Sequence, residues 1–429
     1  MLLSSFRRSA ATAAFRSPYV VASASAATRR TMMAAAAAEP LMKTSLNEWH
    51  KELGGEMVPF AGYELPVLYK GDNVKNGGVM KEHLWCRSEG KASLFDVSHM
   101  GQIRWHGKDR AKFVEKMVVG DIQGLDTNHG CLSLITNDQG GIKDDTVIVN
   151  AGDYIHMVVN GSMKFSDMAH FQKHLDDYDG DVTMEYLEDD MQLLALQGSG
   201  SADVLSKLLP EGFNLKTMAF MTGLDTTIDG IENCRITRCG YTGEDGFEIS
   251  TPSGISTIQI ASKLCSDPNV NPTGLGARDS LRLEAGLCLY GNDLNETINP
   301  IMGTLAWTLG KGGPNARRRQ EQDFTGASTF LKEDGKLKKQ ARKRIGIIGM
   351  KAPARQYTEI YDVDGIQLIG EITSGTFSPC LKKPIAMGYI DTIMSKNDTP
   401  IKLKIRNKMV DAHVTKMPFV ESNYYRVPE

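Results

Sequence analysis

Residues 140–149 read Gly-Gly-Ile-Lys-Asp-Asp-Thr-Val-Ile-Val. The two glycines predict a turn, and the β-branched run after them predicts a strand that leaves a hairpin. Because alternate residues of a strand share a face, Asp145 lies with Val147 and Val149, whereas Asp144 lies on the opposite, more polar face, which we expect to meet water. Asp145 then sits at the edge of an apolar surface, where a carboxylate is costly unless a partner meets it. A turn acid exposed to solvent is the alternative.

The composition is typical of a globular protein with more than one domain. The 429 residues are enough for two or three domains, and the net charge of −3 does not favour a nucleic-acid binder. No apolar run reaches the roughly 18–20 residues of a membrane span, so we expect neither nucleic acid nor a membrane as a partner. The seven cysteines are scattered and lack a C-x-x-C pair. This pattern favours reduced thiols over disulfides or a zinc site.

Residues 1–38 differ from the remainder of the chain. They contain five arginines and many alanines and serines, and no acidic residue occurs before Glu39. This composition is typical of a transit peptide, and the compact apolar core of a secretory signal is absent. We therefore predict a disordered mitochondrial transit peptide and a location in the mitochondrial matrix. A disordered tail without a targeting role is the alternative.

The pattern of apolar residues predicts an α+β fold. Helical spacing over residues 108–118 is followed by strand-like runs such as residues 131–136. Residues 39–311 form the predicted core, and the charged, turn-rich residues 312–342 predict a basic, solvated linker, with docking of an acidic partner protein as the alternative. Residues 343–429 contain short strands separated by turns, which predicts a small antiparallel sandwich or barrel.

Two further segments carry candidate binding residues. Glu248 lies on the opposite strand face from Phe247 and Ile249, and a carboxylate can accept hydrogen bonds from paired N–H donors. Arg278 and Arg282 are four residues apart on a predicted helix, and arginines so spaced suit a carboxylate ligand. A solvated glutamate and a charged helix surface are the respective alternatives.

Some other motifs have more than one interpretation. His99 is a candidate base, although a lone histidine is more often structural, and Met100 either lines a pocket or fills a core. Gly198-Ser-Gly-Ser201 lacks the third glycine of a dinucleotide-binding loop. The aromatic residues near Tyr424 either pin the chain end by packing or close a site.

Five stretches, taken together and in order, resemble the glycine cleavage T-protein family of aminomethyltransferases. The resemblance extends from about Leu41 to Tyr425. The stretches are Phe95-Asp-Val-Ser-His-Met100, Gly140-Gly-Ile-x-Asp-Asp145, Arg238-Cys-Gly-Tyr-Thr-Gly-Glu-Asp-Gly-x-Glu248, Ala277-Arg-Asp-Ser-Leu-Arg-Leu-Glu-Ala-Gly286 and Met417-Pro-Phe-Val420.

This resemblance implies a three-domain cloverleaf fold around a folate site, ending in a β-barrel domain. It also implies the reaction. An aminomethyl group on the lipoyl arm of a partner, lipoylated H-protein, gives its one-carbon unit to tetrahydrofolate, and the products are 5,10-methylenetetrahydrofolate, ammonia and the dihydrolipoyl arm. No metal is expected.

The family's functional residues fall on positions of this chain that the patterns above had already singled out. Asp145 corresponds to the catalytic aspartate, Glu248 to the pterin-binding glutamate, Arg278 to a folate-binding arginine and Tyr424 to a folate-contacting tyrosine. We also expect Met100 and Asn160 to contact the folate.

The chain departs from the family pattern in three places. Residues 158–163 are rearranged around Asn160, Met302 stands where a glutamate is usual, and the segment 312–322 is longer. Two other functions remain open at this point. One is a folate-dependent demethylase of the same superfamily, and the other is a non-catalytic folate-binding factor for iron–sulfur assembly, whose signature matches residues 238–245 poorly.

Overall fold

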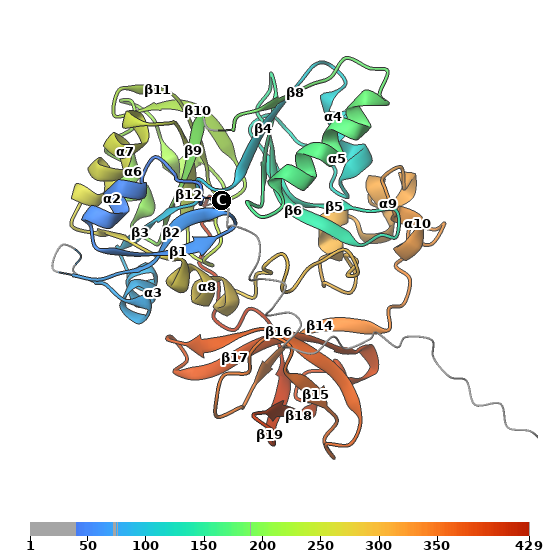
Figure 1. Ribbon diagram of the computed structural model, residues 1–429. Coiled ribbons are helices and arrows are strands. Elements are labelled where there is room, and N and C mark those ends of the chain that lie inside the picture. The colour runs from blue at the N-terminus through green and yellow to red at the C-terminus, as the bar shows by residue number, and fades with distance from the viewer. Residues whose placement is uncertain (1–39, 72–73, 75, 189, 429) are drawn as a thin grey trace, which may run out of the picture. The chain divides into compact units, whose positions relative to one another are not determined.

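The computed structural model describes residues 40–71, 74, 76–188 and 190–428 (Figure 1). The predicted transit peptide, residues 1–38, lies outside the described residues. The described chain mixes helices with antiparallel sheets and ends in a closed barrel, so the predicted α+β class with a C-terminal β-barrel is confirmed. Among the described helices, none combines the length and the apolar character that crossing a membrane requires.

One six-stranded sheet forms half of the region before the barrel. Its strand order is β10-β11-β12-β9-β3-β13, and only the β13–β3 pair is parallel. The core on one face unites strand residues such as Phe247 and Ile249 with apolar residues of helices α6 and α7. The bounds are β3 Ala92–Asp96, β9 Met191–Gln197, β10 Gly223–Ile228, β11 Ile231–Thr237, β12 Gly246–Pro252, β13 Val270–Pro272, α6 Ser201–Ser206 and α7 Ile255–Ser266.

A five-stranded antiparallel sheet forms the other half, in the order β5-β6-β7-β4-β8. Phe113 of α4 and Phe171 of α5 pack with Trp105 and Ile148 in its core. The bounds are β4 Gly101–His106, β5 Gly130–Thr136, β6 Ile142–Asn150, β7 Ile155–Val159, β8 Thr183–Tyr186, α4 Arg110–Met117 and α5 Lys164–Asp176. The helix predicted over residues 108–118 and the strand predicted over 131–136 are confirmed.

The expected exposure of β6 was wrong for one of its faces. The strand period is as predicted, but Asp144 is fully buried and Ile148 belongs to the core, so this face does not meet water. Helix α5 supplies residues that cover it, among them Phe171. A single strand pattern cannot reveal a covering helix that comes later in the chain.

The C-terminal strands close a barrel in the order β14-β17-β16-β15-β18-β19, with β19 paired to β14. On β18, Ile401 and Leu403 point into the barrel core while the lysines between them remain outside. The predicted alternation is therefore confirmed. The bounds are β14 Arg342–Ile348, β15 Glu359–Tyr361, β16 Leu368–Ser378, β17 Lys383–Asp391, β18 Pro400–Ile405 and β19 Lys408–Thr415.

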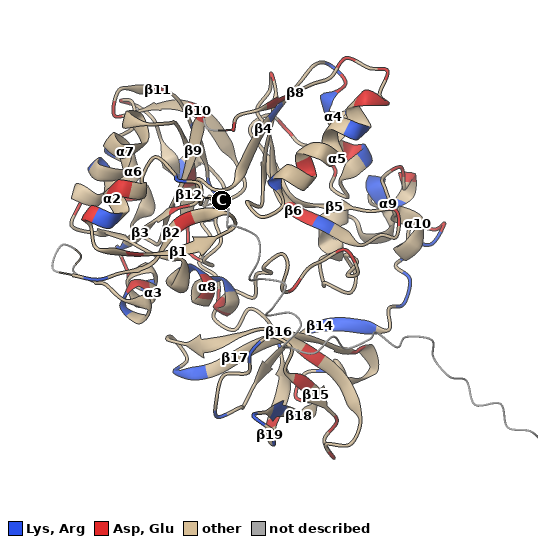
Figure 2. Cartoon of the chain, viewed as in Figure 1, with Lys and Arg blue, Asp and Glu red and all other residues tan. Residues whose placement is uncertain are grey.

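Smaller elements connect these units. A hairpin of β1 (Gly55–Phe60) and β2 (Tyr63–Tyr69) follows α2 (Asn47–Glu52), and α3 (Val79–Arg87) packs against α8 (Leu275–Glu284). Acidic and basic residues are interspersed over these elements and over both sheets, without one large region of a single sign in this view (Figure 2).

The basic segment before the barrel is not a solvated linker, so that part of the prediction was wrong. It contains α9 (Arg317–Glu321) and α10 (Ala327–Phe330), and the Arg318 side chain is fully buried. The Arg318 guanidinium donates to the Val118 carbonyl (3.0 Å) and pairs with Asp323. Phe330 packs in a core with residues of the five-stranded sheet. Charge-rich composition did not reveal these buried anchors.

Candidate active site

A cavity of about 650 Å³ is lined by residues of both sheets, of α8, of the barrel and of the chain end. The residues that the family resemblance assigned to the reaction or to folate all line it, namely Met100, Asp145, Asn160, Glu248, Arg278 and Tyr424, together with the candidate base His99. The structure therefore brings together side chains that are more than 300 residues apart in sequence.

Asp145 lies on β6 with its side chain at the wall of this cavity. Burial raises the pKa of its carboxyl to about 7, and the neighbouring Asp144 adds to this rise, while a hydrogen bond from Asn160 opposes it. A carboxyl group with a pKa near neutrality is present in both protonation states at pH 7, which suits it to move a proton.

Asn160 follows the end of β7 and connects the two aspartates. Its Nδ2 donates to Asp144 Oδ1 (2.8 Å) and Asp145 Oδ1 (3.0 Å), and its backbone N–H donates to Asp144 Oδ2 (2.9 Å). The amide thus fixes the orientation of both carboxyl groups across adjacent strands β6 and β7.

Glu248 projects from the middle of β12, and its neighbours Phe247 and Ile249 point to the opposite face, into the core. The face assignment from the sequence is therefore confirmed. Burial raises the pKa of Glu248, and the positive charge of Arg278 opposes this rise. A buried carboxylate that faces a cavity is suited to a ligand with N–H donors.

Arg278 and Arg282 both lie on α8, but their surroundings differ. Arg282 pairs with Asp293 (2.7 Å) and Asp279 (2.8 Å). Arg278 packs its guanidinium over the Tyr241 ring at 4.8 Å, and its buried Nη1 has no hydrogen-bond partner among the described residues. Of the two predicted carboxylate-binding arginines, only Arg278 is left available for a ligand in the cavity.

The chain end returns to the six-stranded sheet and places Tyr424 in the cavity (Figure 1). Asn423 holds it there, because its N–H donates to the Gly243 carbonyl (2.7 Å) and its side chain donates to Glu244 (3.1 Å). Tyr425 covers the Arg238 guanidinium at 3.7 Å. The packing interpretation therefore holds for Tyr425, and Tyr424 lines the cavity.

Two family models match the chain. The model described as the GCVT N-terminal domain covers residues 46–312, and the one described as the glycine cleavage T-protein C-terminal barrel domain covers residues 342–421. The chain belongs to the glycine cleavage T-protein family. The resemblance found in the sequence motifs is thereby confirmed.

Individual T-protein relatives match over nearly the whole chain. The mitochondrial aminomethyltransferase of Dictyostelium discoideum is 47% identical over 400 residues, which is 90% of this chain and 94% of that protein. The one from Canis lupus familiaris is 44% identical over 390 residues, 90% and 91% of the two chains. The crystal structure of glycine cleavage system aminomethyltransferase T from Bartonella henselae matches with a TM-score of 0.80 and 34% identity, covering 90% of this chain and 100% of that one.

Some cavity residues of this T-protein were not predicted. Phe220 stacks on Tyr424 with ring centroids 4.3 Å apart, and Tyr241 supports Arg278. Tyr241 lies within the motif of residues 238–248, so the sequence could have indicated that it lies at the site. Phe220 lies in an irregular segment, and no periodic pattern marked it.

His99 lines the cavity, but it is a poor candidate for a base. Burial lowers the pKa of its imidazole to about 3, and the positive charge of Arg278 contributes to this shift. Its ring packs against Phe60, with centroids 5.4 Å apart. The structural interpretation of this histidine fits these surroundings.

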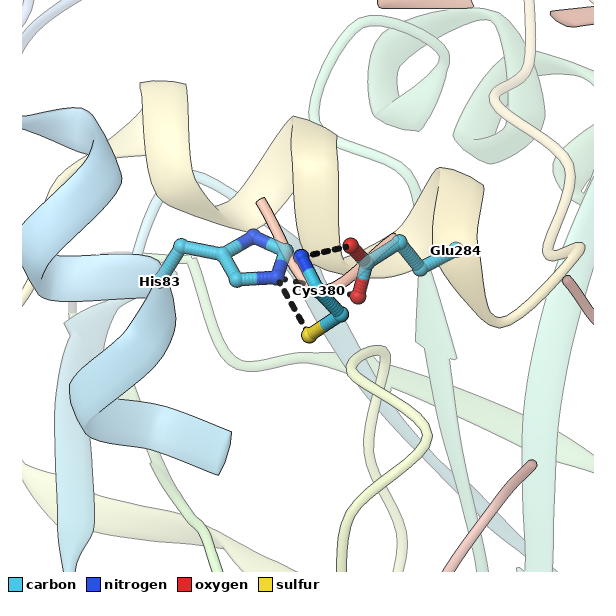
Figure 3. Close-up of side chains that lie close together, drawn as sticks. All are labelled: His83, Glu284 and Cys380. Carbon is cyan, nitrogen blue, oxygen red and sulfur yellow. Dashed lines mark hydrogen bonds and ion pairs between the residues drawn. The ribbon is translucent and has the colours of Figure 1, made fainter. Parts of the chain in front are cut away.

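A second group of ionisable side chains, two of them fully buried, lies outside the cavity lining. His83, Glu284 and Cys380 converge from α3, α8 and the turn after β16 (Figure 3). His83 Nε2 lies 2.9 Å from Glu284 Oε2, and the Cys380 Sγ lies 3.6 Å from the same nitrogen. His83 Nδ1 faces the Ser280 hydroxyl (2.7 Å), which itself donates to the Ala277 carbonyl.

Both carboxylate oxygens of Glu284 accept hydrogen bonds within this second group, so its negative charge is compensated. Arg87 Nη2 donates to Oε2 (3.2 Å), the Cys380 N–H donates to Oε1 (3.2 Å), and the Ser378 hydroxyl also donates to Oε1. Burial alone would raise the pKa of Glu284, but its interactions with His83, Ser378 and Arg87 together lower it to about 2. Because donors occupy both oxygens and the Arg87 guanidinium would repel a cation, we interpret this group as a structural anchor.

Proposed function

We propose that this T-protein is an aminomethyltransferase. In this reaction the one-carbon unit on the aminomethyl-lipoyl arm of H-protein passes to tetrahydrofolate, with release of ammonia and the dihydrolipoyl arm. The observation that carries the proposal is one cavity that is lined by Asp145, Glu248 and Arg278. The Asp145 carboxyl has no ion-pair partner among the described residues. The names of the relatives described above, all aminomethyltransferases, support it.

We assign folate recognition chiefly to two charged side chains, one that accepts hydrogen bonds and one that donates them. Glu248 accepts hydrogen bonds from the pterin N–H groups, and Arg278 binds a carboxylate of the glutamate tail. The unpartnered Nη1 of Arg278 supports this assignment, because a buried donor without an acceptor costs free energy until a ligand supplies one. Tyr424, Met100 and Asn160 complete the wall that contacts the ligand.

We assign the proton chemistry to Asp145. Folate supplies the nucleophilic nitrogens when it is bound. Ionised Asp145 orients them, accepts a proton and stabilises the positive charge that develops as sulfur or ammonia leaves. Positioned acid–base assistance contributes about 10²–10⁴-fold to a rate, and the close placement of two substrates in one cavity contributes much of the remainder.

The test is ammonia release from aminomethyl-loaded H-protein, with and without tetrahydrofolate. We expect folate-dependent release to fall about 10²–10⁴-fold in Asp145→Asn, with folate binding retained. Asp153→Asn, an exposed aspartate just beyond the same strand, is the matched control and keeps full activity. If release persists in Asp145→Asn, the catalytic assignment of Asp145 is wrong, although the proposed aminomethyltransferase activity stands.

The same assay separates the other two functions. A folate-dependent demethylase and a folate-binding assembly factor both bind folate, so binding alone does not distinguish them. Strict dependence on lipoylated H-protein does. Neither alternative is favoured by the relatives that match this chain.

We also propose the domain division and the location. Residues 39–311 form the folate-binding core, residues 312–342 connect it to the barrel, and residues 343–429 form the barrel domain. The limits of the two matching family models support this division. The relatives are named mitochondrial, which together with the composition of residues 1–38 supports import into the matrix.

A further inference from the structure

Two more carboxyl groups lie behind Asp145, away from the cavity. Asp144 comes from β6 and Asp167 from the first turn of α5, and both are fully buried. Each of the two carboxyl groups shifts the pKa of the other, so the two lie close together. The proposed role of Asp145 does not use either of them.

The available donors do not satisfy both groups as anions. Each oxygen of Asp144 accepts one hydrogen bond from Asn160. The two buried oxygens of Asp167 have no donor from any other side chain or backbone group in the described parts of the chain. A buried carboxylate without a donor costs several kcal/mol, whereas one proton placed between two facing carboxyl groups satisfies both of them.

We propose that Asp144 and Asp167 share one proton and form a positioning pair, which holds Asn160 and, through its amide, holds Asp145 in place for the reaction. The inference rests on the proposed function of Asp145. The connection is continuous in the structure, since Asn160 Nδ2 contacts Asp144 Oδ1 at 2.8 Å and Asp145 Oδ1 at 3.0 Å.

The electrostatic surroundings agree with this arrangement. Burial and the facing carboxyl raise the pKa of Asp144 well above its usual range, and burial also raises the pKa of Asp167. The other charged or titratable groups that influence the pair are Lys143, whose positive charge favours ionised Asp167, and Tyr290 and Asp145. The pair thus carries one negative charge, which adds to the burial that raises the pKa of Asp145.

The shared proton has a spectroscopic signature that does not depend on activity. At about pH 9, above the pKa of Asp145, we expect the infrared spectrum of the full-length protein to retain a carboxylic-acid C=O band that shifts in heavy water. Asp167→Asn removes this band, because the Asn amide can donate to Asp144 in place of the proton. Asp176→Asn, an exposed residue of the same helix, retains it.

The pH profile of folate-dependent ammonia release tests the link to Asp145. In Asp144→Asn the negative charge nearest to Asp145 is gone, so the pKa of Asp145 falls. The acidic side, or limb, of the pH–rate profile therefore moves to lower pH by about one unit. In Asp167→Asn the charge is fixed on Asp144, so the limb moves to higher pH by a smaller amount. A merely structural pair would lower turnover at every pH without opposite shifts of the limb.

Two results would overturn the inference. One is that Asp167→Asn and the unchanged protein show the same carboxylic-acid band, which would rule out the shared proton. The other is a limb that stays in place in both variants while thermal unfolding shows them folded. Should Asp144→Asn fail to fold, the infrared spectrum and the limb of Asp167→Asn alone decide the matter. Failure of the proposed function shows itself separately, as unchanged turnover in Asp145→Asn.

Discussion

The two buried carboxyl groups at Glu284 and Asp145 differ in how far the protein compensates them. Glu284 is fully buried among His83, Arg87 and further donors, and its pKa falls to about 2. Asp145 lies at a cavity wall beside another acid, and its pKa rises to about 7. Burial acts in the same direction on both, so the neighbouring groups decide whether the carboxyl is fixed as an anion or poised to exchange a proton.

Helix α8 shows the same contrast between its arginines. Arg282 has two carboxylate partners, whereas Arg278, one turn away, has an unsatisfied nitrogen and a pKa lowered by burial. In these two comparisons, the compensated charges of Glu284 and Arg282 join elements of the fold, and Asp145 and Arg278 face the cavity.

The largest effect is expected on stability when the compensated group is broken. Glu284→Gln leaves the buried Arg87 guanidinium and the His83 ring without the carboxylate that they contact, so we expect the free energy of unfolding to fall by about 3–5 kcal/mol at pH 7. Urea denaturation measures it. Because the folded-state pKa of Glu284 is depressed, its contribution is present above the unfolded pKa of about 4.5 and is lost as pH falls toward 2. The difference between the two proteins therefore narrows below pH 4.5.

The matched control is a surface pair on the barrel. Glu359 and Lys404 lie 2.8 Å apart with about two-fifths of each side chain exposed, and exposed pairs contribute about 0–1 kcal/mol. If Glu284→Gln lost no more stability than Glu359→Gln, the description of Glu284 as a structural anchor would be wrong.

A smaller effect is expected on ligand affinity when the uncompensated arginine is removed. Arg278→Ala loses a charge-assisted contact worth about 1.5–3 kcal/mol, so the Kd for tetrahydrofolate rises about 10–150-fold. In the absence of folate the loss of stability is limited to the packing of Arg278 on Tyr241, about 0.5–2 kcal/mol, since Nη1 has no hydrogen-bond partner among the described residues. Fluorescence or calorimetric titration measures the affinity, and an unchanged titration rejects the assignment of Arg278.

The sequence predicted those cavity residues that the alternation of a strand assigns to one face. The alternation of β6 and β12 assigned Asp145 and Glu248 to their faces, and family motifs selected Arg278 over Arg282. The sequence did not predict what covers an element from elsewhere in the chain. Asp144 and Arg318 were assigned to water, and both are buried by contacts with residues distant in sequence. Phe220 was missed because it acts through stacking on Tyr424, a contact across some 200 residues.

The smallest effect is expected on the stability of the uncompensated site itself. The folded-state pKa of Asp145 is raised from 3.8 to about 7, so the folded chain binds more protons than the unfolded chain between these values. Ionising Asp145 therefore destabilises the fold as pH rises from about 4 to about 7, with no further change above. Asp145→Asn removes this cost, and we expect it to be more stable than the unchanged protein by about 1–3 kcal/mol at pH 8.

The full shift would correspond to about 4 kcal/mol, but Asp145 keeps part of its surface in the cavity, and solvent there reduces the cost. Urea denaturation at pH 3.5 and pH 8 measures the difference, with Asp153→Asn as the exposed control. A gain that grows with pH, in the variant that has lost turnover, means that the protein gives up stability to keep this carboxyl uncompensated. A loss of stability at pH 8 would place Asp145 with Glu284, among the anchors of the fold.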